Sequence, residues 1–194
     1  KEQEFSLFDD KNRKCNLISL LCGSLYTLYL VSVESEKNNQ LALQYDNREK
    51  LTFLNTNNHN PVYLFGGKKE AAAIDTEGNI ILIKPDYKNI KDQVIIAALP
   101  NGEKPVSIAV PGIYIYVADS NGGVFKANMD DMVFSKVEEL EGEEVIEVSG
   151  TFYDCLAVCK SGRVYEGSRF LKFKKISSLE KYKIVSASDS GSHS

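Results

Sequence analysis

Residues 134–193 read FSKVEELEGEEVIEVSGTFYDCLAVCKSGRVYEGSRFLKFKKISSLEKYKIVSASDSGSH, and this stretch nearly repeats itself after 39 to 40 residues. The polar turn with glycine at residues 160–165 has a counterpart 40 residues earlier, at 120–125, and another 44 residues before that, at 76–81. A period of about 40 residues is typical of architectures in which each unit packs on its neighbours. The matched pairs are Phe134 with Phe173, Lys136 with Lys175, Val137 with Ile176, Leu140 with Leu179, and Val145 with Ile184.

Each repeat contains about four short apolar runs separated by tight turns, and no stretch of helical period lies between them. Four antiparallel strands in 40 residues predict one blade of a β-propeller. We therefore expect an all-β fold, a propeller of four-stranded antiparallel blades that forms an incomplete ring in this chain. The closing strands of the second, third and fourth units are predicted at residues 94–98, 134–140 and 173–179.

The repeat also predicts the domain organisation. Residues 1–15 hold one apolar patch before a charged run, and are expected to be a partial blade or an N-terminal extension. Residues 16–194 are expected to form propeller blades, with the last blade cut at 194 and both ends lying inside a longer protein. The glycines that mark the beginnings of successive hairpins are Gly23, Gly67, Gly112, Gly150 and Gly191.

The composition is that of an ordinary globular protein. The 194 residues are 43% hydrophobic and 26% charged, with a net charge of -4 and a pI near 5.3. Nucleic-acid binders usually present a basic surface, so no nucleic-acid partner is expected. No window of eighteen apolar residues occurs, so no membrane span is expected.

Four cysteines occur, and the spacing within each of their two pairs excludes a C-x-x-C zinc motif. On one strand Cys155 and Cys159 would lie about 13 Å apart, which is too far for a disulfide. We interpret Cys15, Cys22, Cys155 and Cys159 as reduced, partly buried thiols, and expect the protein in the cytoplasm or nucleus.

One family is similar in sequence. Residues 145–150 (VIEVSG), 155–158 (CLAV) and 161–167 (SGRVYEG) resemble the repeat of the regulator of chromosome condensation family, and residues 191–194 (GSHS) resemble its glycine and histidine-serine segment. The resemblance covers roughly residues 16–194. It implies a β-propeller that binds protein partners, or one that exchanges guanine nucleotide on a small GTPase as the founding members do.

The chain departs from the family pattern in two ways. It has no tryptophan at all, and the family's histidine step is replaced at the corresponding positions by Tyr26, Glu70, Ile115 and Tyr153. The family propeller is usually seven-bladed, whereas this chain supplies about four units. Ring closure is therefore expected from further chain or from a second copy, since unpaired terminal strands are prone to aggregate.

The titratable residues do not form a catalytic pattern. His59 and His193 are the two histidines, and neither is expected to join a Ser-His-Asp or metal cluster. Asp75, Glu77, Asp119 and Asp154 are interpreted as solvated turn residues, because turns favour aspartate. The glycines lie in hairpins and not between a strand and a helix, so no phosphate-binding loop is expected. No catalytic, cofactor-binding or metal-binding residue is predicted, no cofactor is expected, and the binding residues stay unidentified.

Two charged runs and three tyrosines remain open to alternative interpretations. The charged runs either solubilise a face or serve in partner binding or in blade pairing, and the tyrosines either pack in the core or form an aromatic contact patch. The acidic run is Glu138, Glu139, Glu141, Glu143 and Glu144, the basic run is Lys172, Lys174, Lys175, Lys181 and Lys183, and the tyrosines are Tyr114, Tyr116 and Tyr153.

Two functions are consistent with these observations. The first hypothesis is a non-catalytic β-propeller that mediates protein-protein interaction within a larger protein. The alternative is guanine-nucleotide exchange on a small GTPase, which needs no enzyme motif. A propeller hydrolase or lyase would need clustered histidines around the axis, and the chain has only two histidines.

Overall fold

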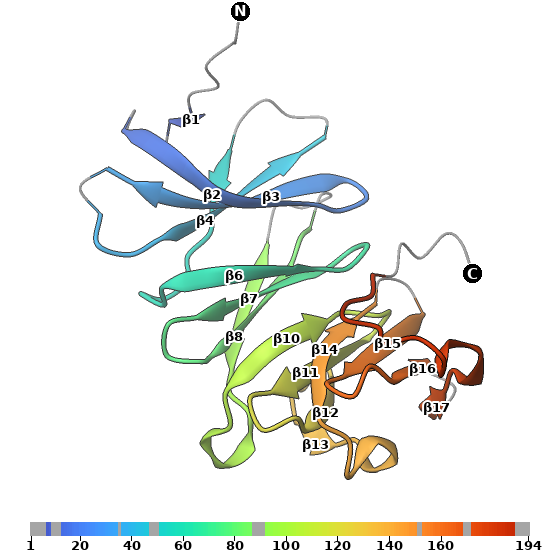
Figure 1. The fold of residues 1–194 in the computed structure, drawn as a ribbon. Helices are drawn as coiled ribbons and strands as arrows, with labels where there is room; N and C mark the ends of the chain where they lie inside the picture. Colours follow the sequence, from blue (N-terminus) through green and yellow to red (C-terminus); the bar gives the residue numbers. More distant parts are fainter. Residues whose placement is uncertain are drawn as a thin grey trace, which may run out of the picture.

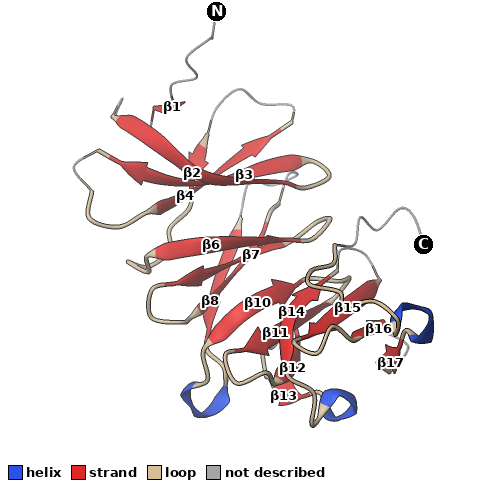
Figure 2. Cartoon of the chain, in the orientation of Figure 1, coloured by secondary structure: helices blue, strands red, loops and turns tan. Residues whose placement is uncertain are grey.

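The computed structural model describes residues 7–8, 13–34, 36–46, 51–86, 92–150, 153–168 and 172–188, and their fold is all-β. Figure 1 shows four antiparallel sheets following one another in an arc, without a closed ring, as the repeats predicted. We call these sheets blades 1 to 4 in chain order. Within the described ranges the helices are three single 3₁₀ turns (Figure 2): η1 (Pro100–Gly102), η2 (Glu138–Leu140) and η3 (Ser177–Leu179). None of them is long and apolar enough to cross a membrane.

Each blade is one uninterrupted stretch of chain whose strands pair in sequence order. Blade 1 contains β1 (Leu7–Phe8), β2 (Lys14–Cys22), β3 (Tyr26–Val33), β4 (Gln40–Tyr45) and β5 (Thr52–Phe53). Blade 2 contains β6 (Pro61–Gly66), β7 (Ala71–Asp75), β8 (Ile80–Lys84) and β9 (Gln93–Ala97). Blade 3 contains β10 (Pro105–Ala109), β11 (Tyr114–Asp119), β12 (Val124–Asn128) and β13 (Ser135–Lys136). Blade 4 contains β14 (Val145–Ser149), β15 (Asp154–Cys159), β16 (Val164–Ser168) and β17 (Lys174–Lys175).

Most of the core lies in the three seams between successive blades, and a smaller cluster of Cys15, Tyr29, Val31, Val33 and Ala42 lies within blade 1. The seam between blades 1 and 2 joins Leu28 and Leu30 to Ile81 and Ile83. The next two seams are built in the same way, from β7, β8, β10, β11 and β12, and then from β10, β11, β14 and β15. Because strand residues alternate between the two faces of a sheet, a blade with a neighbour on each side packs both of its faces against other blades.

The strands β2, β6, β10 and β14, which we call the inner strands, each carry a β-bulge at a corresponding place. The register shifts between Leu17 and Ser19, Pro61 and Tyr63, Pro105 and Ser107, and Val145 and Glu147. The extra residue is apolar in all four strands, being Ile18, Val62, Val106 or Ile146. A bulge bends its strand and strengthens the local twist. Its repetition shows that the four blades share their backbone geometry.

The hairpin glycines are required by both backbone conformation and packing. Gly78, Gly122 and Gly162 have φ angles of +85°, +86° and +90°, the left-handed region that glycine adopts most readily. An added Cβ would lie 2.9 Å from Glu144 Cα at Gly122 and 2.8 Å from Lys183 Cα at Gly162. The chain leading into the next blade therefore crosses directly over the glycine.

Two predicted closing strands are much shorter than expected. Residues 134–140 and 173–179 were predicted as strands, but β13 and β17 span two residues each and continue as η2 and η3. In blade 3 the reason is the three-residue spacing of Val137 and Leu140, since a 3₁₀ turn puts residues i and i+3 on one side. Both side chains are buried in the seam between blades 3 and 4. In the second unit the closing strand β9 has its full length.

Two further predictions concern the ends of the chain. In the region expected to be a partial blade or an extension, β1 pairs antiparallel with the first two residues of β2. Gly191 and His193 lie outside the described residues.

Candidate interaction face

The turns between the second and third strands of blades 2, 3 and 4 (residues 75–79, 119–123 and 159–163) lie beside the loops that enter those blades. We call this end of the blades the hairpin face. Backbone hydrogen bonds join the two in each of blades 2, 3 and 4. Thr76 donates to Asn60 O at 3.0 Å, and Ser120 donates to Lys104 O at 2.8 Å. Lys160 donates to Glu144 O, also at 2.8 Å. In each of these blades the hairpin turn and the loop that enters the blade therefore lie side by side.

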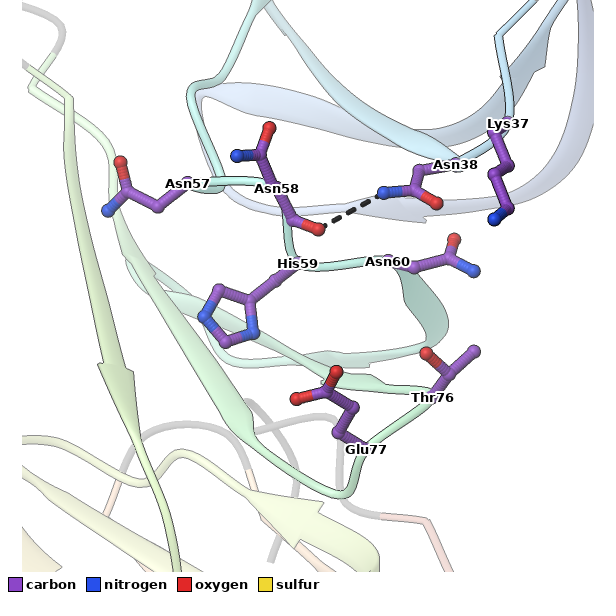
Figure 3. A pocket seen from close by; sticks show the side chains of 8 residues that line it. All are labelled: Lys37, Asn38, Asn57, Asn58, His59, Asn60, Thr76 and Glu77. Carbon is purple, nitrogen blue, oxygen red and sulfur yellow. Dashed lines mark hydrogen bonds between the residues drawn. The ribbon is translucent and has the colours of Figure 1, made fainter.

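A polar hollow of about 460 Å³ opens on the hairpin face between blades 1 and 2 (Figure 3). Four of its lining side chains are asparagine amides, each with donor and acceptor atoms. Asn38 Nδ2 donates to Asn58 O at 3.1 Å, and Asn60 Oδ1 accepts from the N–H of Asn39 at 2.8 Å, so the two blades are bonded across the hollow. The lining residues are Lys37, Asn38, Asn57, Asn58, His59, Asn60, Thr76 and Glu77.

One of the loops that line the hollow contains a turn that asparagine makes possible. Asn57 and Asn58 have φ angles of +51° and +68°, and asparagine enters this region more readily than other side chains. Asn55 Oδ1 accepts the N–H of Asn57 at 2.9 Å, and Thr56 Oγ1 donates to His59 O at 3.0 Å. The asparagine-rich composition of this loop therefore serves its backbone shape as well as its surface.

His59 pairs with Asp75, a contact that the sequence analysis did not predict. His59 Nδ1 lies 2.5 Å from Asp75 Oδ2, and Asn79 Nδ2 donates to the same oxygen at 2.8 Å. Asp75 Oδ1 accepts the N–H groups of Glu77 and Asn79 at 2.9 and 2.7 Å. Burial alone would raise the pKa of Asp75, but these bonds from Asn79, His59 and Glu77 outweigh it and hold that pKa below its usual value.

This bonding corrects the interpretation of Asp75 as a solvated turn residue. Its carboxylate is 3% exposed and accepts four N–H groups, one for each lone-pair position. Possible ligand atoms of His59, Asp75 and Glu77 lie within 4.8 Å of one another. A cation would have to displace the bonds that fold the hairpin, so the trio fits a structural role and not a metal site.

Asp119 has the same role in blade 3. Its Oδ1 accepts the N–H groups of Asn121 and Gly123 at 2.9 and 2.7 Å, and the residue is 4% exposed. The prediction of a solvated side chain is therefore wrong for Asp119 as well. Glu77 is exposed in its turn as predicted, whereas Asp154 is exposed but begins β15 and lies outside any hairpin turn.

In blade 4 the acidic side chain near the hairpin is Glu143, which belongs to the loop before β14. Cys159 stands where blades 2 and 3 have aspartate, and Glu143 accepts from Tyr165 Oη at 2.7 Å and pairs with Arg163 at 2.7 Å. Burial and the Glu143 charge raise the pKa of the Cys159 thiol to about 11. The hydrogen bond to Glu143 raises the pKa of Tyr165 to about 12. None of the four cysteines forms a disulfide, and Cys22 is the exposed one.

The two charged runs touch at one place among the described residues. Lys172 Nζ lies 3.4 Å from Glu139 Oε1, which joins blade 4 to blade 3. Other members of the runs pair with residues that are near in the sequence. Lys136 Nζ lies 3.7 Å from Glu141 Oε1, and Lys175 Nζ lies 2.5 Å from Glu180 Oε1. Exposed pairs of this kind contribute about 1 kcal/mol or less. The runs are therefore mainly a solvated surface with one contact between blades.

The three tyrosines do not form one aromatic patch. Tyr116 is buried in the seam and meets the Phe173 ring edge-on, with centroids 5.6 Å apart. Tyr114 lies at the margin of the same seam, with Lys126 Nζ 3.8 Å from its ring centroid. Tyr153 is 41% exposed, so core packing, the other interpretation, holds for Tyr116 and fails for Tyr153.

Comparison with known proteins rests on structure alone, because no protein-family model and no curated protein matches the sequence. Human WBSCR16 superimposes with a TM-score of 0.66, at 11% identity, over 89% of this chain and 55% of that chain. Prp20p of Saccharomyces cerevisiae, the yeast RCC1, gives 0.62 at 11% identity, over 84% of this chain and 46% of that one. YCF48 bound to the D1 peptide gives 0.51 at 14% identity, over 90% and 56%.

The chain has the RCC1-like β-propeller fold. The similarity at these identities establishes the fold, in agreement with the resemblance of residues 145–167 to the family repeat. This RCC1-like propeller spans about half the length of the solved structures that it matches.

A second hollow lies along the axis of the RCC1-like propeller. It measures about 330 Å³ and is lined by residues of all four inner strands, among them Leu21, Phe65, Ile108 and Val148. Ala187, which follows blade 4, lines it too. The inner strands therefore face a common axis, as propeller blades must.

Proposed function

We propose that this chain is a non-catalytic interaction module of a larger protein and that it binds a protein partner through the hairpin face, in the cytoplasm or nucleus. The observation that carries the proposal is the amide-rich hollow between blades 1 and 2, whose polar atoms suit hydrogen bonding to a protein surface. The histidine and buried carboxylate beside it are engaged in folding a hairpin. Further chain or a second copy is proposed to complete the ring.

Proteins with the same fold support this proposal. The yeast RCC1 structure was determined bound to Kap60, and Prp20p was studied for its binding to Gsp1p and histones. YCF48 was determined bound to a D1 peptide. Proteins with this fold therefore present protein-binding surfaces, and each of them binds a different partner.

Two experiments test the proposal: cross-linking of the chain to its partner, and binding measurements on two charge-reversal variants. The chain is cross-linked in extract of the cells that express it, and each candidate partner is then purified and titrated against the chain. We expect cross-links on the hairpin face, and we expect Lys37→Glu to weaken binding about tenfold. Lys174→Glu is the matched control, since it makes the same change at an exposed residue of the outer strand β17. An equal effect of both changes, or cross-links confined to the outer strands, would contradict the proposal.

Guanine-nucleotide exchange is the second candidate, because Prp20p has the same fold and was studied for its binding to Gsp1p. Exchange requires only that a surface distort the nucleotide site of its partner. Release of a fluorescent GDP analogue from a panel of small GTPases measures it directly. Acceleration at substoichiometric amounts of the chain supports exchange, and unchanged release across the panel removes this candidate.

A further inference from the structure

The outermost strands of the four blades differ sharply in length. β5, β13 and β17 have two residues each, whereas β9 of blade 2 has five. In blades 3 and 4 the chain leaves the sheet through η2 and η3 directly after the short strand. Among the described residues, β9 hydrogen-bonds to β8 alone and ends its sheet. In the part of the chain that the structure describes, the outermost strand of blade 2 is therefore longer than that of any other blade.

β9 also lacks the features that protect edge strands from pairing. Native edges are blunted by charge, proline, bulges or short length. β13 and β17 have lysines and two-residue length, but β9 reads QVIIA, with no charge and no proline. Its five residues pair with β8 in continuous register, from Lys84 with Gln93 to Ile80 with Ala97. Every second N–H and C=O of such a strand points away from its partner.

Both faces beside this edge are apolar. Val94 and Ile96 pack toward the seam with blade 1, and Ile95 packs toward the seam with blade 3. On the blade 3 side, Lys84 Nζ pairs with Asp130 at 2.9 Å, which brings the segment after β12 to blade 2. That segment includes Val133, which is 70% exposed. A strand added to β9 would continue the packing of both seams.

We propose that β9 is a docking site for an extended, uncharged and β-branched segment of a protein partner, which adds to blade 2 as a fifth strand. The alternating outward N–H and C=O groups select an extended main chain, because no other ligand matches their spacing. The apolar flanks select its side chains. The inference rests on the proposed interaction function and deepens it, since it names a second contact and the chemistry of the segment bound there.

The probe is an acetylated, amidated peptide that holds the sequence of residues 93–97 between two lysines at each end. The control peptide has the same side chains and charge, with its three central residues N-methylated so that neither edge can donate a ladder hydrogen bond. We expect the first peptide to slow amide hydrogen exchange in residues 93–97, and the N-methylated peptide to bind at least about tenfold more weakly. Equal binding of the two peptides, or protection elsewhere only, would overturn the proposal.

Proline substitution tests the same edge from the side of the protein. Of the two adjacent residues Ile95 and Ile96, one N–H points to β8 and the other points outward. The variant Ile95→Pro or Ile96→Pro that keeps the melting temperature identifies the outward N–H, and in that variant we expect peptide binding to fall about tenfold or more. If neither variant is stable, hydrogen exchange with the two peptides decides. A partner that binds wild type and this variant equally overturns the β9 site but leaves the interaction function standing.

Discussion

At the residue scale, the strand that enters the hairpin turn ends in aspartate in blades 2 and 3 and in cysteine in blade 4. Asp75 and Asp119 accept backbone N–H groups of their own turns, whereas Glu143, which lies near Cys159 in blade 4, accepts from the Tyr165 side chain and pairs with Arg163. A buried carboxylate is tolerated there because each of its bonds is charge-assisted. The aspartates are thus part of the folding of the blades.

The Asp75 carboxylate gives stability a defined dependence on pH. Its pKa in the folded chain lies below the unfolded value of about 3.9. The stabilisation is therefore complete above that unfolded value and is lost as the pH falls through the lower, folded pKa, by at most about 1.4 kcal/mol per pH unit. We expect Asp75→Asn to lower the free energy of unfolding by about 1–3 kcal/mol at pH 7 and to flatten its fall below pH 4.

Urea unfolding between pH 7 and pH 3 measures this effect. Glu77→Gln is the control, because Glu77 is exposed in the same turn. An acid limb of unchanged steepness in Asp75→Asn would show that other carboxylates produce it.

Gly122 combines a left-handed backbone with a close approach of the next blade. Gly122→Ala is expected to lower the free energy of unfolding by about 2–4 kcal/mol, because the added Cβ meets both strain and Glu144. Gly102→Ala separates the two terms, since Gly102 has a φ of +76° and no atom within 4 Å of the added Cβ. We expect about 1 kcal/mol there. Equal losses in the two variants, measured by urea unfolding, would show that strain alone matters.

At the element scale, the sequence predicted strand order and turns well and strand ends poorly. Apolar runs bounded by glycine turns placed β7, β8, β11 and β12 correctly, because two-residue periodicity and turn chemistry are local properties. The spacing of Val137 and Leu140 is also a local property, and a 3₁₀ turn could have been predicted from their three-residue separation. The burial of Asp75 and its pairing with His59 were not available, since a turn aspartate has the same sequence signal whether it is solvated or buried.

Adjacent blades are also joined by a buried hydroxyl. Ser107 Oγ donates to Val148 O at 3.0 Å and accepts the N–H of Val148 at 3.1 Å, so one side chain serves both backbone groups. We expect Ser107→Ala to lower the free energy of unfolding by about 1–3 kcal/mol, because both groups of Val148 lose a buried partner.

The matched control is Ser135→Ala, which removes an exposed hydroxyl from β13 and is expected to cost less than about 0.5 kcal/mol. Thermal unfolding followed by circular dichroism measures both variants. Comparable losses in the two would show that the Ser107 bonds add nothing to the seam.

At the scale of the whole molecule, the repeat period predicted the class of fold. The local sequence pattern could not predict the number of blades in the intact ring. The outer face of blade 1 shows the consequence: Leu17, Ile18 and Leu20 are 46%, 49% and 51% exposed. In the three seams the corresponding faces are covered by a neighbour. A blade of a completed ring would bury this face in the same manner.

Because every blade is a single contiguous stretch, tension applied to the two ends of the chain reaches one blade at a time. An inner blade is held by two seams and blade 1 by one, so we expect stepwise rupture in an optical trap, beginning at an end of the arc. Each step releases one repeat of 39 to 44 residues. The contour length should then grow by about 140 to 160 Å per event, at roughly 3.6 Å per residue. A single rupture of the whole chain would mean that the seams bind the blades into one mechanical unit.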